Sequence, residues 1–184
     1  MSETAEKTII LAHSPDPDDA FMHYALAKDH LDAGDIKFIH KLEDIESLNQ
    51  RAMHGEYEIT AVSIHAYAYV SDKYCLLNHG ASMGEGYGPR IIAREEFKLE
   101  DLQKGNGKRL AIPGEWTSAH LAAQMRIGVY DFAVVEFDQI PVAVERGDFD
   151  AGLIIHEGQL TFQDQGLVML EDLGVWWGSE TGGL

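Results

Sequence analysis

The sequence predicts an α/β fold divided into two lobes, and three observations support this prediction. Short apolar runs alternate with amphipathic segments of helical length along the 184 residues. Such alternation is typical of parallel or mixed sheets whose faces are covered by helices. A glycine-rich segment, HGASMGEGYGPR at 79–90, interrupts the alternation between two strand-like runs. With 45% hydrophobic and 24% charged residues, the chain is also long enough to bury a substantial core.

The expected strands are short runs of mainly apolar residues bounded by polar residues or glycine. They are expected at 8–13, 36–40, 58–63, 74–79, 89–94, 109–114, 131–137, 149–155 and 166–172. Apolar residues at helical spacing predict helices at 18–32, 44–54, 64–72, 117–128 and 138–147. In the last of these, Ile140 and Val144 share one face, and Gly147 ends the helix.

The glycine-rich segment is expected to connect the two lobes. Within it, GEGYGP continues into a strand-like run, PRIIAR, rather than into a helix, so it does not fit the dinucleotide-binding fingerprint. A crossover between lobes explains its glycines better than a phosphate-binding loop does. The first lobe is therefore expected to cover 1–88 and the second to begin at Pro89, with a ligand-binding cleft between them.

The composition restricts the partners and the compartment. A net charge of -17, from 14 basic and 31 acidic residues, argues against nucleic acid and anionic membrane surfaces as partners. A single cysteine, Cys75, excludes a disulfide framework and a cysteine-rich zinc site, and its apolar surroundings predict a buried thiol. The amino terminus, MSETAEKTII, lacks a basic signal-peptide region, so we expect a cytoplasmic protein.

The segment SPDPDDAF, which follows the first strand, is the first candidate for a site. Each proline holds the residue before it in an extended conformation, so Asp18 or Asp19 is placed to cap the next helix. Ser14 and Asp19 are expected to contact substrate, because open α/β sheets bind ligands at strand ends. His13, Asp16 and Asp18 offer ligand groups for a metal, but a rigid helix-capping turn accounts for this segment better. We expect neither a metal nor a cofactor.

Two further strand ends carry hydroxyl groups where a helix should begin. Ser63 ends the strand in TAVSIHAY, and Thr117 and Ser118 follow the strand in PGEWTSAH. These residues have two interpretations, as helix caps or as a site for a small anion. Hydroxyls and free N–H groups at helix starts can hold a carboxylate without any lysine, which suits a chain this acidic.

His156 is the candidate general base. It follows the apolar run in DAGLIIHEGQ, at the carboxyl end of the predicted strand, where an imidazole that titrates near neutral pH could accept a proton. The alternative is a structural histidine that ends a buried strand. His65 and His120, just inside two of the predicted helices, are second candidates. No serine or cysteine lies in a recognisable nucleophile motif.

Several stretches, in this order along the chain, resemble the 1,4-dihydroxy-6-naphthoate synthase family of the futalosine pathway of menaquinone biosynthesis. They are HSPDPDDAFMHYAL, EDIESLNQRAMHGEYEITAVS, GASMGEGYGP, AIPGEWTSAHL, GDFDAGLIIHEGQLTF and GLVMLEDLGVWW. The resemblance implies a two-lobed fold of the type II periplasmic-binding-protein kind, with mixed sheets and helices on both faces. It also implies a carbon–carbon lyase that converts cyclic dehypoxanthine futalosine to 1,4-dihydroxy-6-naphthoate without a metal or cofactor.

The same resemblance implies roles for individual residues. His156 matches the family's proton acceptor. The remaining matches form two substrate-binding turns, one in each lobe: Ala61, Val62 and Ser63 in the first, and Ser118 and Ala119 in the second. The implied partner is a small anionic substrate that bears a carboxylate.

The chain departs from the family pattern in its opening turn and in its length. Asp16, Asp18 and Ala20 stand where the family usually has a cysteine, an asparagine and a threonine. The family continues beyond WWGSETGGL, so the second lobe is expected to end at 175 and 176–184 to begin a return to an incomplete first lobe. Two other functions stay open: a chorismate dehydratase-like enzyme of the same superfamily, and a non-catalytic solute-binding protein.

Overall fold

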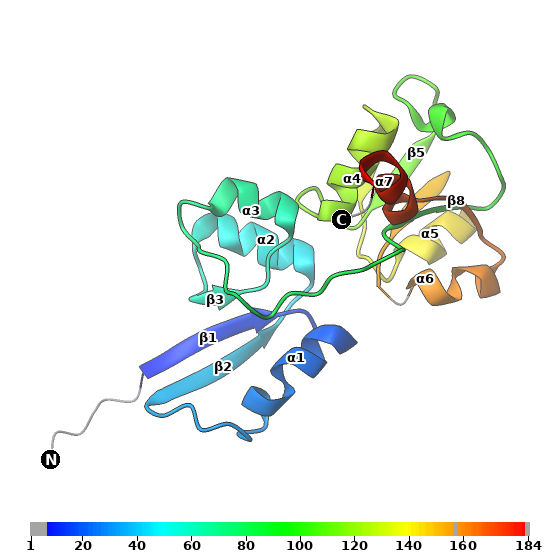
Figure 1. The fold of residues 1–184 in the computed structure, drawn as a ribbon. Coiled ribbons are helices and arrows are strands. Elements are labelled where there is room, and N and C mark those ends of the chain that lie inside the picture. The colour runs from blue at the N-terminus through cyan, green and yellow to red at the C-terminus, as the bar shows by residue number, and fades with distance from the viewer. Residues whose placement is uncertain (1–6, 157, 183–184) are drawn as a thin grey trace, which may run out of the picture. The chain divides into compact units, whose positions relative to one another are not determined.

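The computed structural model describes residues 7–156 and 158–182. The chain divides into two compact units, Met1–Ser82 and Met83–Leu184, and each unit contains its own β-sheet (Figure 1). The division falls inside the glycine-rich segment 79–90. Among the described residues, no helix is long and apolar enough to cross a membrane.

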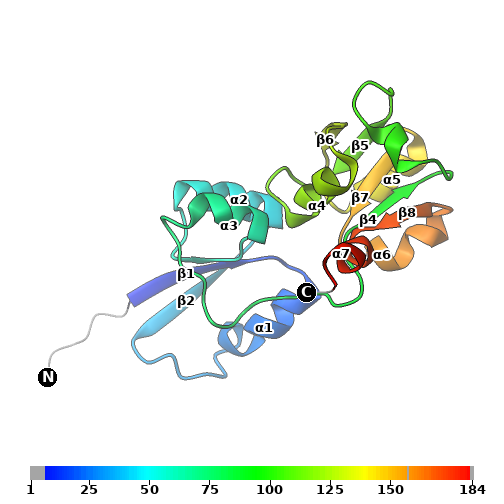
Figure 2. The ribbon, with the colours of Figure 1, turned by 45° about the horizontal axis from the view of Figure 1, so that its top comes forward.

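The first unit contains a three-stranded parallel sheet in the order β2-β1-β3. Its strands are β1 (Lys7–His13), β2 (Ile36–Leu42) and β3 (Ile59–Thr60). Its helices are α1 (Pro17–Ala27), α2 (Ile45–His54) and α3 (Ile64–Val70). Helix α1 lies on one face of the sheet, and α2 and α3 lie on the other, as Figures 1 and 2 both show. Because the strands are parallel, all their carboxyl ends meet at one edge.

The second unit contains a five-stranded mixed sheet in the order β6-β5-β7-β4-β8. Its strands are β4 (Arg90–Ala93), β5 (Arg109–Ile112), β6 (Asp131–Val134), β7 (Ala151–Ile154) and β8 (Val168–Asp172). Strands β5, β6 and β7 run parallel, and β4 runs antiparallel between β7 and β8. The helices are α4 (Ser118–Ile127), α5 (Ile140–Arg146), α6 (Gly158–Thr161) and α7 (Leu173–Thr181), with 3₁₀ turns η1 (Leu99–Leu102) and η2 (Phe162–Gln165).

Two hydrophobic clusters cover the two faces of this second sheet. Leu153 and residues of α4 and α7 belong to one cluster, whereas the next residue in β7, Ile154, belongs to the other with residues of α5. Successive strand residues therefore point into opposite cores. A strand that is buried on both faces needs a continuous apolar run, which is what RIIA, RLAI and AGLI provide. The predicted α/β fold with mixed strands and helices on both faces is confirmed.

The predictions for 74–79 are wrong. This segment forms no strand, and Cys75, which we expected to be buried, is exposed. The neighbouring Leu76 and Leu77 are also exposed, so this part of the apolar run YCLLNH is not buried in a core. A short apolar run cannot distinguish a core strand from a surface segment unless a pairing partner is known.

Two helices also end or begin where the sequence did not predict it. The predicted helix 18–32 ends at Ala27, because Asp29 has a left-handed backbone with φ 54° that an α-helix cannot contain. After β8 the chain forms α7, a helix that was not predicted, and Leu173 is buried in the core of the second unit.

Gly152, in the middle of β7, lets α5 approach the sheet closely. A Cβ atom at this position would lie 2.5 Å from the Cγ2 of Ile140 and 2.8 Å from the Cγ2 of Val144. Both neighbours are β-branched and have little freedom to move aside. We therefore expect Gly152→Ala to lower the free energy of unfolding by about 1–3 kcal/mol, as measured by urea denaturation.

A matched control is Gly178→Ala in α7, where a Cβ would meet nothing within 4 Å. Alanine is the better helix former, so this variant is expected to be more stable by about 0.5–1 kcal/mol. Equal effects of the two substitutions would contradict the close packing of β7 against α5.

Candidate functional site

In the first unit, the segment after β1 folds into a buried turn that starts α1. The Ser14 hydroxyl is buried and donates a 2.6 Å hydrogen bond to Oδ2 of Asp16. Asp16 is the N-cap residue, and its extended backbone (φ -63°, ψ 154°) is the conformation that Pro17 imposes on the residue before it. The prediction that Asp18 or Asp19 caps α1 is therefore wrong, because both lie inside its first turn.

His13 and His23 flank Asp19, and His40 extends this cluster through His13, a proximity that was not predicted from the sequence. His13 ends β1, His40 lies on β2, and His23 lies one helical turn after Asp19 on α1. The Oδ1 atom of Asp19 is 4.0 Å from Nδ1 of His13 and 4.0 Å from Nε2 of His23. The Nε2 atom of His13 is 3.0 Å from Nδ1 of His40. Burial, followed by the charge of Asp18, raises the pKa of the Asp19 carboxyl.

The turn after β3 is held in place by a buried asparagine. Asn49, on α2, donates from Nδ2 to the Ser63 hydroxyl at 3.0 Å, and its Oδ1 accepts from the Ser63 backbone N–H at 2.8 Å. Ala61 and Val62 are half-buried, and the Ala61 N–H donates to the Ala12 carbonyl at 2.8 Å. The turn is therefore rigid. Asn49 was missed because nothing in the sequence pairs it with Ser63.

In the second unit, Thr117 caps α4. Its hydroxyl oxygen accepts from the His120 N–H at 3.2 Å and donates to the Gly114 carbonyl at 2.8 Å, so the buried side chain is committed to the turn. Ser118, the first helical residue, is exposed. The Ala119 methyl group is buried in the core, so any contact with a ligand would run through its backbone.

His156 lies two residues beyond the end of β7, at the carboxyl edge of the sheet. Its ring is half-buried and meets Phe137, which follows β6, edge-on with ring centroids 5.3 Å apart. Its backbone is left-handed, with φ 58°. Thr117 follows β5, the strand between β6 and β7. The loops after three parallel neighbouring strands therefore place Thr117, Phe137 and His156 along one edge, the usual position of ligand sites in α/β sheets.

Arg90, a site residue not predicted from the sequence, supports the segment after His156. It opens β4 and pairs with Ile154 in the ladder. Its Nε donates to Oδ2 of Asp172 at 3.0 Å, and one terminal nitrogen donates to the Gln159 carbonyl at 2.9 Å. A cation at the start of a strand has no obvious partner in the sequence, so only the sheet order reveals this contact.

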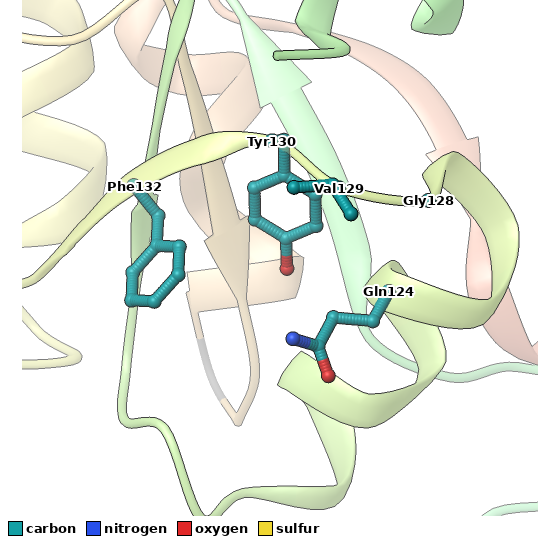
Figure 3. A pocket seen from close by; sticks show the side chains of 5 residues that line it. All are labelled: Gln124, Gly128, Val129, Tyr130 and Phe132. Atoms are coloured by element: carbon teal, nitrogen blue, oxygen red, sulfur yellow. The ribbon is translucent and has the colours of Figure 1, made fainter.

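His120, the second candidate base on α4, is surrounded by structural contacts. It is buried, its Nδ1 is 2.8 Å from the Tyr130 hydroxyl, and burial raises the pKa of that phenol. Tyr130 also lines a shallow cavity of about 280 Å³ together with Gln124, Gly128, Val129 and Phe132 (Figure 3). Three of these residues precede or begin β6, at its amino end. This cavity therefore contains none of the predicted site residues and lies away from His156.

The fold places the chain in the class of type II periplasmic-binding-protein-like proteins. The alkanesulfonate-binding protein SsuA of Xanthomonas axonopodis has this fold, with a TM-score of 0.65 at 12% identity over 92% of this chain and 62% of that one. An Archaeoglobus fulgidus protein of known crystal structure is 44% identical, with a TM-score of 0.87 over 95% of this chain and 63% of that one.

The chain belongs to the menaquinone biosynthesis family, whose model matches residues 9–184. It is 38% identical to a 1,4-dihydroxy-6-naphthoate synthase of Thermus thermophilus over 94% of this chain and 61% of that protein. It is 35% identical to the synthase of the same name from Streptomyces coelicolor over 95% of this chain and 62% of that protein. It thus spans about three fifths of the length of these relatives. The predicted family is confirmed.

Removing Asn49 should unfold the first unit more easily. Asn49→Ala leaves the half-buried Ser63 N–H and hydroxyl without these partners, so we expect a loss of about 1–3 kcal/mol in the free energy of unfolding. Urea denaturation followed by circular dichroism measures it. Asn106→Ala, at an exposed asparagine whose side chain donates to the Glu100 carbonyl, is the control and should cost less.

The histidine cluster predicts a pH dependence. Burial, and then the charges of neighbouring histidines, lower the pKa of both His23 and His40. The folded chain therefore binds these protons more weakly than the unfolded chain, whose histidines titrate near pH ~6.5. The stabilisation from keeping them neutral is complete above that pH and is lost as the pH falls below it. We expect the free energy of unfolding to fall between pH ~7.5 and ~5.5, and to fall less in His23→Gln.

Urea denaturation at constant ionic strength measures this slope. His40→Gln, at the other histidine whose pKa is lowered, should also reduce the slope. A slope that His23→Gln leaves unchanged would show that the cluster is not the titrating group.

Proposed function

We propose that this chain provides the fold and the base of a cytoplasmic carbon–carbon lyase, which converts cyclic dehypoxanthine futalosine to 1,4-dihydroxy-6-naphthoate in menaquinone biosynthesis. Family membership and two relatives named 1,4-dihydroxy-6-naphthoate synthase support this proposal. The single observation that carries the assignment of the base is the position of His156 at the carboxyl edge of the second sheet. The proposed partner is a small carboxylate-bearing substrate, with no nucleic acid and no membrane.

The backbone of His156 favours a functional role over a structural one. A φ of 58° is uncommon for a residue other than glycine, and such conformations persist where the surroundings impose them, often at active sites. The left-handed turn directs the chain out of β7 and into α6, and the Gln159 N–H closes it by donating to the His156 carbonyl at 3.1 Å. A histidine that merely filled the core could sit within β7 without this strain.

The proposed chemistry is proton abstraction followed by elimination. His156 would remove a proton from the substrate, and the carbanion or enolate formed would expel the sugar-derived fragment. The start of α4, a ten-residue helix, offers backbone N–H groups and the exposed Ser118 hydroxyl to a carboxylate or to developing negative charge. Phe137 would hold the imidazole in orientation from its edge-on position.

The test is a product assay with His156→Gln. The 184-residue chain, and a version completed with the unmatched part of the Thermus thermophilus relative, are incubated with cyclic dehypoxanthine futalosine, and the naphthoate is quantified by chromatography. Loss of a general base should lower kcat by about 10²–10⁴-fold and leave substrate affinity nearly unchanged. His54→Gln is the matched control and should keep full turnover.

The other functions that the sequence left open give different results in this assay. Turnover of chorismate instead of the futalosine derivative would favour the dehydratase-like enzyme. Tight binding of another small anion, without turnover of either substrate, would favour a solute-binding protein. Turnover that His156→Gln does not change would make His156 a structural residue.

A further inference from the structure

We infer that His13, Asp19 and His23 form a binding site for one divalent transition-metal ion of the zinc class in the first unit. Each of the three residues offers one ligand atom, and these atoms all lie within 4.8 Å of one another. Two imidazoles and a carboxylate are a ligand set that proteins use for zinc and related ions. This inference concerns metal binding alone and does not rest on the proposed lyase activity.

The spacing of the ligand atoms leaves room for an ion between them. The Asp19 carboxylate approaches a nitrogen of His13 and one of His23 to 4.0 Å, which is too far for a hydrogen bond. Ligands about 2.1 Å from a tetrahedral zinc ion lie about 3.4 Å apart. Small side-chain rotations would close that difference. These 4.0 Å distances are too long for hydrogen bonds but close to the separation of ligand atoms around one ion. This distinguishes the group from an ordinary polar cluster.

The fold holds these residues at fixed positions. His13 ends a β-strand, and Asp19 and His23 are spaced i, i+4 on α1, so they share one face of the helix. The rings of His13 and His23 lie 4.4 Å apart, centroid to centroid. Residues on a strand and a helix keep a more precise geometry than residues on loops, which favours a metal site over a chance cluster.

His13 also has the outer contacts that a ligand histidine needs. Its Nδ1 lies 2.9 Å from the Ser14 carbonyl, and its Nε2 lies 3.0 Å from Nδ1 of His40. Whichever nitrogen binds the ion, the other keeps a hydrogen-bond partner that orients the ring, as is usual around metal-bound histidines.

His40 supplies an independent observation. Its Nε2 is buried and has no hydrogen-bond partner among the described residues. Its ring lies 5.3 Å from that of His13 and 6.4 Å from that of His23, so His40 extends the cluster, with Nδ1 facing His13. A buried polar atom without a partner is rare in a folded protein, so the cluster has unused capacity to bind a polar ligand or an ion. The net charge of -17 further favours a cation over an anion here.

The test is a titration of the tag-free chain with Zn²⁺ by calorimetry, and with Co²⁺ by visible absorption. We expect one ion per chain with a Kd in the micromolar range or tighter, and a rise in Tm with Zn²⁺. Asp19→Asn and His23→Gln should each weaken binding at least tenfold. Asp19→Asn preserves the shape of the side chain, so its far-UV circular dichroism should match that of the parent chain.

Two variants serve as matched controls, since exposed histidines and thiols also bind metals. His54→Gln and Cys75→Ser remove exposed ligands of the first unit and should leave the affinity for the first ion unchanged. Absence of binding by the parent chain would overturn the inference. So would equal affinity in Asp19→Asn, or a loss that follows His54 or Cys75 instead of the cluster.

Discussion

The geometry of the second unit depends most on the hydrogen bonds and the ion pair that the buried carboxylate of Asp172 makes. Asp172 ends β8, caps α7 by accepting from the backbone N–H groups of Gly174 and Val175, and accepts a further backbone N–H from Gly88. Its other oxygen pairs with Arg90. Four donors from two separate parts of the chain, 88–90 and 174–175, therefore converge on one side chain. An ionised carboxylate this well satisfied can remain buried, whereas the loss of a single charged partner typically costs about 3–5 kcal/mol.

This contact also controls where His156 lies. Arg90 uses one part of its guanidinium for Asp172 and another for the Gln159 carbonyl, so the start of α6 is tied to the entry of β4. The backbone at Gly88 and Gly174 approaches so closely that a Cβ at Gly88 would lie 2.5 Å from the Gly174 nitrogen. The glycines are thus needed for the packing and not for flexibility. Arg90 therefore contacts the chain both before His156, through its ladder pairing with Ile154, and after it, through the Gln159 carbonyl.

The sequence predicted the fold well where physical patterns are local. Continuous apolar runs such as RLAI and AGLI identify strands buried on both faces, and Gly147 ends α5 in the left-handed conformation expected of it. It failed at YCLLNH, where an apolar run has no partner strand, and at α7, whose segment LGVWWGSET contains glycines that disfavour a helix in isolation. Burial of Leu173 and the Asp172 cap overcome that propensity, and both are tertiary effects.

The candidate site residues show even more clearly that local sequence patterns do not reveal contacts between residues far apart in the chain. Ser63 and His156 could be selected because each follows an apolar run directly, and Thr117 because it stands where a helix should start after a strand. Asn49 could not, because its bond to Ser63 joins residues 14 positions apart on different elements. The histidine cluster is a further case. The parallel register pairs Leu11 with His40 and His13 with Leu42, so side chains 27 positions apart in sequence share one face of the sheet.

The two candidate sites, the histidine cluster and the start of α4, suit ligands of opposite charge. The long-range electrostatic field of this acidic chain favours the cation site at the histidine cluster. Among the described residues, the histidine cluster faces Asp19 and has no lysine or arginine partner, so the overall charge of -17 adds to the attraction for a cation. At the start of α4 an anion must overcome that field. Screening at physiological salt limits the field to about 8 Å, whereas helix N–H groups and a hydroxyl act at hydrogen-bond distance. Local donors can therefore bind a carboxylate on an acidic protein, provided that the ligand reaches them at close range. This requirement explains why such a site needs a rigid turn such as the one that Thr117 closes.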